Sequence, residues 1–106
     1  MGKRNESHVK TRVKRTLTAA ECYQHWPVQT GYGAACLDCH GCYREQYFAV
    51  ETKAPGKHPT PRQELTINDI RAAGGAVFVI GESYDVKTER FSGEDELDAW
   101  LILNAP

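Results

Sequence analysis

Apolar side chains recur every four residues near the start of the chain. Val9, Val13 and Leu17 form one stripe at helical spacing, with basic side chains on the other faces. The stripe predicts a helix that reaches at least Leu17. Residues 1–4 precede this pattern, and we expect them to be loose.

Three segments of β type follow the predicted helix. Residues 22–28 mix aromatic and β-favouring side chains and predict a short strand broken near Pro27. Residues 37–43 and 47–53 predict two more strands, joined by a turn at residues 44–46. The last strand alternates, with Phe48, Val50 and Thr52 facing one way and Tyr47, Ala49, Glu51 and Lys53 facing the other.

A second helix is indicated by its start signals. Thr60 suits the N-cap, Pro61 suits the first helical position, and Gln63 completes a capping box. The helix should end at the glycine pair 74–75. It runs through the apolar residues Leu65, Ile67 and Ile70.

The rest of the chain predicts one more strand and one more helix. Residues 76–80 are a continuous apolar run, as expected of a strand buried on both faces. Residues 93–103 predict a C-terminal helix with Leu97, Trp100 and Leu101 on its core face.

The predicted order is helix, three strands, helix, strand, helix. A helix between the third and fourth strands implies a crossover, so the sheet should be mixed. A chain of 106 residues has room for one compact core. We therefore predict a single α/β domain over residues 1–106, with helices flanking a small mixed sheet.

The composition is that of an ordinary globular protein, with 41% apolar and 25% charged residues. No stretch approaches the roughly 20 apolar residues of a membrane span. The first residues are polar and charged, unlike the apolar core of a signal peptide. We expect a cytoplasmic protein with no membrane partner.

Charge is distributed unevenly along the chain. Residues 1–62 contain ten Lys or Arg and five Asp or Glu, a net +5, whereas residues 63–106 contain three and nine, a net −6. A basic half is compatible with a polyanion such as nucleic acid. Two solvated surfaces of opposite sign, facing each other in a dimer, would explain the same distribution.

Three charged residues on the two middle strands carry the candidate chemistry. A hairpin can bring Asp38 beside Glu51, where two carboxylates repel unless a divalent cation lies between them. Oxygen ligands of this kind suit Mg²⁺ or Mn²⁺, which would activate a water and polarise a phosphodiester. Lys53 shares the face of Glu51 and would stabilise the transition state or position the water. Alternatively, all three are solvated charges on an exposed strand face.

An ordered set of four motifs extends this pattern. The set is Leu37-Asp38, Phe48-Ala49-Val50-Glu51-Thr52-Lys53-Ala54-Pro55-Gly56-Lys57, Pro59-Thr60-Pro61-Arg62-Gln63 and Ala73-Gly74-Gly75-Ala76-Val77-Phe78-Val79-Ile80. Over about residues 5–82 it resembles the VRR-NUC family, the virus-type replication–repair branch of the PD-(D/E)xK nucleases, and looks closest to stand-alone phage-encoded members. Before Asp38 the chain has Ala35-Cys36-Leu37, where many members have a Gly-x-Pro turn.

The resemblance implies a restriction-endonuclease-like core of order α-β-β-β-α-β, extended by the C-terminal helix, and a metal-dependent endonuclease activity. Asp38, Glu51 and Lys53 take the catalytic roles on this basis. The two carboxylates and the backbone carbonyl of Thr52 become ligands of Mg²⁺ or Mn²⁺. Gln63 matches a signature glutamine at the start of the following helix, and its capping-box role is compatible with that.

The resemblance also implies a glutamate from the first helix at the catalytic and metal site. Glu6, about one turn before Val9, is the favoured candidate, and Glu21 at the far end of the helix is the other. Asn5 and Ser7 are both suitable N-caps. The choice between them decides whether Glu6 lies inside the first turn.

The implied substrate is DNA, cut at branched structures such as Holliday junctions rather than at a specific sequence, since little of so short a chain remains to read bases. A homodimer is implied, acting in the host-cell cytoplasm if the protein is phage-encoded. The expected DNA-contacting residues are Lys10, Arg12, Lys14 and Arg15 on the first helix, with Gln29, Tyr32, Lys57 and Arg62 elsewhere.

Cysteines Cys36, Cys39 and Cys42 are regularly spaced, and the run from Cys36 to His40 matches a haem-attachment pattern. In a strand, however, Cys39 points away from the other two, which disfavours both haem and zinc. We expect buried, reduced cysteines. Two other functions stay open: a DNA-binding module that does not cut, and a zinc-binding interaction module that uses these three cysteines.

Overall fold

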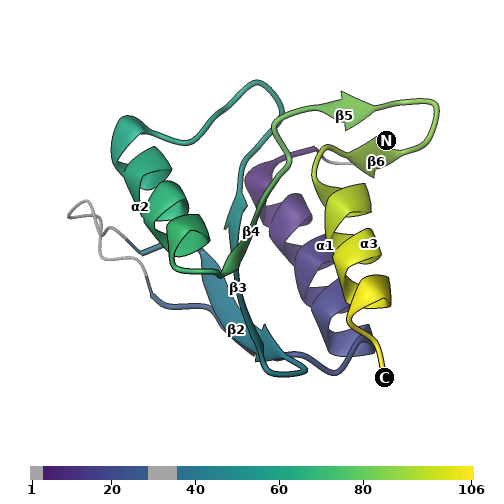
Figure 1. The fold of residues 1–106 in the computed structure, drawn as a ribbon. Helices are drawn as coiled ribbons and strands as arrows, with labels where there is room; N and C mark the ends of the chain where they lie inside the picture. The colour runs from purple at the N-terminus through teal and green to yellow at the C-terminus, as the bar shows by residue number, and fades with distance from the viewer. Residues whose placement is uncertain (1–3, 29–35) are drawn as a thin grey trace.

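Residues 4–28 and 36–106 are described by the structure, a computed structural model. They form three helices, a four-stranded sheet and a two-stranded hairpin (Figure 1). In chain order the elements are α1 (Glu6–Ala19), β1 (Tyr23–His25), β2 (Cys39–Tyr43), β3 (Gln46–Thr52), α2 (Pro61–Ala72), β4 (Ala76–Ile80), β5 (Tyr84–Asp85), β6 (Arg90–Phe91) and α3 (Glu94–Leu103). The predicted order is confirmed, with an additional hairpin before the last helix.

The sheet has the order β1-β2-β3-β4 and is mixed. β1 pairs antiparallel with β2 and β2 antiparallel with β3, whereas β3 and β4 are parallel. Parallel neighbours require a crossover connection, which α2 supplies. The predicted α/β arrangement around a mixed sheet is therefore confirmed.

Helices lie on both faces of the sheet, with α2 on one face and α1 and α3 on the other (Figure 1). The stripe Val9, Val13 and Leu17 is at most 1% exposed and shares one buried cluster with Phe48 and Val50 of β3. A smaller cluster on the α2 side consists of Leu37, Ala49, Ile67 and Val77. No helix within residues 4–28 and 36–106 is long and apolar enough to cross a membrane.

β3 lies at the centre of the fold and is covered on both faces. Phe48, Val50 and Thr52 face α1, and Ala49 and Glu51 face α2. All five residues are at most 2% exposed. The predicted alternation is confirmed, and it places a carboxylate, that of Glu51, in a nearly closed environment.

Two strands are shorter than predicted. The strand expected at residues 37–43 begins only at Cys39, because the N–H of Asp38 bonds to a side-chain carboxylate instead of a ladder carbonyl. The strand expected at residues 22–28 is limited to Tyr23–His25. As a consequence, Asp38 lies directly before β2, at the end of the sheet, rather than within a strand.

α2 begins and ends at the predicted signals. Thr60 is the N-cap and forms a capping box with Gln63, and Gly74 follows the helix with a φ of +98°. Ile67 is buried against the sheet. Leu65 is 66% exposed, because two residues correspond to about 200° around a helix and place it on the opposite side.

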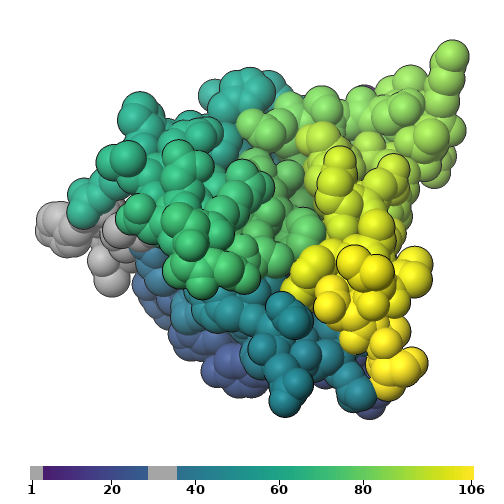
Figure 2. All heavy atoms as spheres, in the orientation of Figure 1, coloured from purple at the N-terminus to yellow at the C-terminus, as the bar shows by residue number. Residues whose placement is uncertain are grey.

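The β5–β6 hairpin was not expected from the polar sequence that forms it. Its anchor is Phe91, which is 2% exposed and packs against Tyr84, with ring centroids 4.9 Å apart. The hairpin protrudes beside α3 (Figure 2). Arg4, expected to be loose, places its guanidinium 4.2 Å from the Tyr84 ring, and the rest of that expectation, residues 1–3, lies outside the described residues.

Candidate active site

The register of the β2–β3 pair brings two carboxylates together. Cys39 lies opposite Val50, so the next position along the same register places Asp38 opposite Glu51. The Asp38 N–H donates to Glu51 Oε1 at 3.2 Å. The predicted proximity of these two residues is thus present in the structure, at the edge where β3 and β4 both end.

The Asp38 carboxylate is held by one neighbouring residue. Its Oδ2 accepts hydrogen bonds from both the N–H and the hydroxyl of Thr52, each at 2.9 Å. The Asp38 side chain is 10% exposed. These two bonds orient the carboxylate and leave Oδ1 directed away from Thr52. The predicted role of the Thr52 carbonyl as a metal ligand stays a prediction.

Glu51 is bonded at both of its oxygens. Besides the Asp38 N–H at Oε1, Oε2 accepts from Gln63 Nε2 at 2.8 Å and lies 3.1 Å from Lys53 Nζ. Burial and, next, the charge of Asp38 raise the pKa of Glu51 to about 7, against the lowering effect of Lys53. Glu51 therefore titrates near neutral pH.

Gln63 forms the predicted capping box and also contacts Lys53 and Glu51. Its Oε1 accepts from the Thr60 N–H and from Lys53 Nζ, each at 2.9 Å, while its Nε2 donates to Glu51. The capping box thus fixes the amide at the N-terminus of α2. Gln63 in turn holds the catalytic candidates Glu51 and Lys53 in place.

The first helix approaches the same edge through its first two turns. Asn5 is the N-cap, so Glu6 lies inside the first turn. Lys10 Nζ lies 3.5 Å from Glu6 Oε2 and 3.8 Å from Asp38 Oδ1. Glu21 follows the C-cap at the opposite end of this 14-residue helix, about 20 Å away, so the carboxylate near Asp38 is Glu6.

Lys10 is the member of this cluster that sequence reasoning placed elsewhere. It was expected on a DNA-contacting face, whereas here its ammonium lies between two carboxylates. The spacing of Glu6 and Lys10, four residues apart on a helix, was a signal for their pairing. The contact with Asp38 depends on how α1 packs on the sheet.

The donor set fits a hard divalent cation only in part. Among the described residues, no group of three or more His, Cys, Asp or Glu is arranged to hold a metal ion. Asp38 and Glu51 supply carboxylates at the same end of the sheet, and Mg²⁺ commonly uses one or two carboxylates, completing its shell with water and substrate phosphate. These two residues are of the type that holds the ion, whereas the carboxylate of Glu6 is paired with Lys10.

The other expected DNA-contacting residues are divided among several roles. Arg12 makes a bidentate pair with Glu94 of α3 at 2.8 and 3.0 Å, which joins the basic and acidic parts of the chain. Lys14 lies 4.9 Å from the Trp26 ring centroid. Lys14 is exposed, as are Arg15, Lys57 and Arg62. Gln29 and Tyr32 lie outside the described residues.

The cysteines are free, but they are not all buried as expected. Cys39 is fully buried, and burial raises its pKa to about 12. Cys36 and Cys42 are exposed, and Cys22 is half-buried. Cys39 packs on the α1 side of the sheet, whereas Cys42 points to the other face. The three regularly spaced cysteines therefore do not converge.

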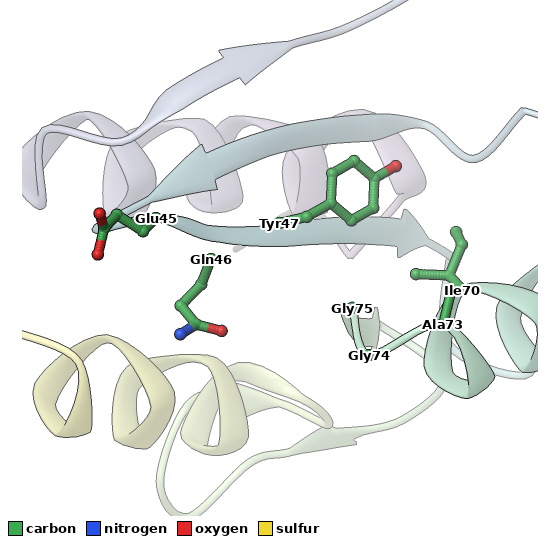
Figure 3. Close-up of a pocket in the computed structure, with 7 residues that line it drawn as sticks. All are labelled: Glu45, Gln46, Tyr47, Ile70, Ala73, Gly74 and Gly75. Atoms are coloured by element: carbon green, nitrogen blue, oxygen red, sulfur yellow. The ribbon is translucent and has the colours of Figure 1, made fainter.

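A pocket of about 360 Å³ lies at the other end of β3 (Figure 3). It is lined by Glu45, Gln46, Tyr47, Ile70, Ala73, Gly74 and Gly75. Gln46 and Glu51 are five residues apart on one strand, about 16 Å. The pocket therefore contains neither Asp38 nor Glu51, which lie at the opposite end of the sheet.

Comparison of the chain with protein-family models, with curated proteins and with solved structures found no match. A functional interpretation therefore depends only on the residues at this end of the sheet and the bonds among them.

Proposed function

We propose that this protein is a metal-dependent endonuclease acting on DNA, with a restriction-endonuclease-like core of the VRR-NUC type. The observation that carries the proposal is the bonded cluster of Asp38, Glu51, Lys53 and Gln63. The four residues are separated in sequence by up to 25 positions, yet each contacts another at one edge of the sheet. Solvated surface charges would not be bonded to one another, with both carboxyl-bearing residues buried as Asp38 and Glu51 are.

Each residue has a distinct task in the proposed reaction. Bound between Asp38 and Glu51, Mg²⁺ or Mn²⁺ would supply charge neutralisation and acidify a water. Lys53, held by Glu51 and Gln63, presents its ammonium to the scissile phosphate or to the attacking water. Thr52 keeps Asp38 in its orientation by two hydrogen bonds.

A branched DNA substrate and a homodimer complete the proposal. Three different segments carry exposed cations, namely Arg15, Lys57 and Arg62. These side chains suit contacts with the phosphates of a branched DNA. Two copies would bring two such centres to two strands. Binding should weaken steeply with rising salt, and a flat salt response would contradict the phosphate contacts.

The test is cleavage of labelled four-way junctions and matched linear duplexes with Mg²⁺ or Mn²⁺. Glu51→Gln and Lys53→Ala should reduce the junction-cutting rate at least about 100-fold. The matched controls Glu96→Gln and Lys87→Ala, which alter exposed charges on α3 and in the hairpin turn, should stay within about twofold of wild type. Equal cutting by Glu51→Gln and wild type would refute the site. Tight binding without cutting would favour a DNA-binding module.

A further inference from the structure

The ammonium of Lys10 lies between two carboxylates at this end of the sheet, those of Glu6 and Asp38. It lies 3.8 Å from Asp38 Oδ1, beyond a normal hydrogen bond, and 3.5 Å from Glu6 Oε2. Asp38 Oδ2 is satisfied by Thr52, so Oδ1 is the oxygen left for a cation. Lys10 therefore acts at Asp38 through its charge rather than through a directed bond.

The two lysines near the carboxylates are held very differently. Lys53 is 13% exposed and has close partners in Glu51 and Gln63, at 3.1 and 2.9 Å. Lys10 is 35% exposed, and its contacts with Glu6 and Asp38 are longer. A flexible stem and a loose ion pair allow the Lys10 ammonium to move without breaking the packing of α1. Lys53 has no such freedom.

We propose that Lys10 is an internal counter-cation, which neutralises Asp38 in the metal-free protein and has to leave it when a divalent cation binds. This inference rests on the proposed metal site. Lys10 and a divalent cation both seek Asp38 Oδ1, and like charges about 4 Å apart repel strongly. Withdrawal of the ammonium also frees Glu6 from its pair, so that a third carboxylate, besides Asp38 and Glu51, becomes available to the cation.

Competition between Lys10 and a divalent cation for Asp38 would also affect DNA binding. A displaced Lys10 ammonium remains tethered beside the metal site and becomes available to a phosphate oxygen. Metal and DNA should then support each other's binding, and the coupling has to be reciprocal. Lys10 would thus serve the DNA contact that its sequence position suggested, but only in the metal-loaded protein.

The experiment measures Mn²⁺ binding without DNA, by calorimetry and by the EPR signal of free Mn²⁺. Lys10→Met removes the charge and keeps most of the stem, while Lys10→Arg keeps the charge. Lys14→Met is the matched control, because Lys14 lies one turn further on α1, over Trp26. Lys10→Met should bind Mn²⁺ about five- to tenfold more tightly than wild type. Lys10→Arg and Lys14→Met should stay within about twofold of wild type.

A second readout is thermal stability, which needs no cleavage. In EDTA, Lys10→Met should unfold at a lower temperature than wild type, and it should gain more from saturating Mn²⁺. An unchanged or weaker Mn²⁺ affinity in Lys10→Met would overturn the inference, while Mn²⁺-dependent cutting by wild type would leave the proposed function intact. If neither wild type nor Lys10→Met binds Mn²⁺, both the inference and the metal site fail.

Discussion

The backbone N–H of Asp38 donates a hydrogen bond to the carboxylate of Glu51, two residues that the β2–β3 register places opposite each other. This bond replaces a ladder bond at the end of the sheet and draws one acidic side chain against the backbone of another acidic residue. Two acidic residues thereby lie next to each other at low exposure, 10% for the Asp38 side chain and 3% for that of Glu51. Such an arrangement costs stability unless a proton or a cation relieves it.

The first prediction concerns the pH dependence of stability. The pKa of Glu51 is raised from its ordinary 4.5 to about 7 in the folded, metal-free protein, chiefly by burial. The folded state therefore binds more protons than the unfolded state between these values. The contribution of protonated Glu51 to the free energy of unfolding is complete below pH 4.5 and is lost as the pH rises through about 7. The loss should be about 3 kcal/mol, measured by urea unfolding in EDTA.

The control for this prediction is Glu51→Gln, which cannot ionise. The variant should lack that part of the pH dependence and should equal or exceed wild type in stability at pH 8. Glu96→Gln, an exposed position on α3, should keep the wild-type pH dependence. If Glu51→Gln and wild type lose stability in parallel over this range, another group is responsible.

The second prediction separates the two roles of Gln63. Gln63→Ala removes the bond to the Thr60 N–H and the contacts with Lys53 and Glu51, so stability should fall by about 1–2 kcal/mol and cutting at least about tenfold. Thr60→Ala removes the other half of the capping box and should lower stability while nearly preserving activity. Measurements are thermal unfolding and junction cleavage. Equal activity losses in the two variants would assign Gln63 a capping role alone.

The third prediction concerns the pair that joins α1 to α3. Arg12→Ala leaves Glu94, whose side chain is 8% exposed, with the Phe91 N–H as its remaining bond. An uncompensated buried carboxylate should cost about 2–3 kcal/mol in urea unfolding. Arg15→Ala, on the same helix but exposed, should cost no more than about 0.5 kcal/mol. Similar small effects of both substitutions would show that the Arg12–Glu94 pair contributes little to stability.

The fourth prediction concerns the cysteines. At pH 8, iodoacetamide should label Cys36 and Cys42 readily in the folded protein, because both are exposed. Cys39 is fully buried with a pKa of about 12, so it should react only after unfolding. All four cysteines lie in one tryptic peptide, residues 16–44, so fragmentation of that peptide by tandem mass spectrometry is used to locate each label. Bound zinc that protects Cys36 and Cys42 would instead support the zinc-binding module.

The sequence determined the elements whose signals are local. The stripe Val9, Val13 and Leu17 follows helical periodicity, and Thr60 with Gln63 marks a helix start independently of the rest of the chain. It also identified the residues that meet at the sheet edge, because a short hairpin leaves few registers between its two strands. The β5–β6 hairpin escaped this reasoning, since strands of two residues carry no periodicity.

Only the tertiary structure decided the pairing of charges between elements. Helical spacing presented Lys10, Arg12 and Lys14 as one basic group, but the packing of α1 on the sheet sends them to Asp38, Glu94 and Trp26 respectively. The burial that raises the pKa of Glu51 likewise comes from α2 closing over β3. Periodicity determines which residues share a face of an element, whereas the partners of that face depend on how distant parts of the chain pack together.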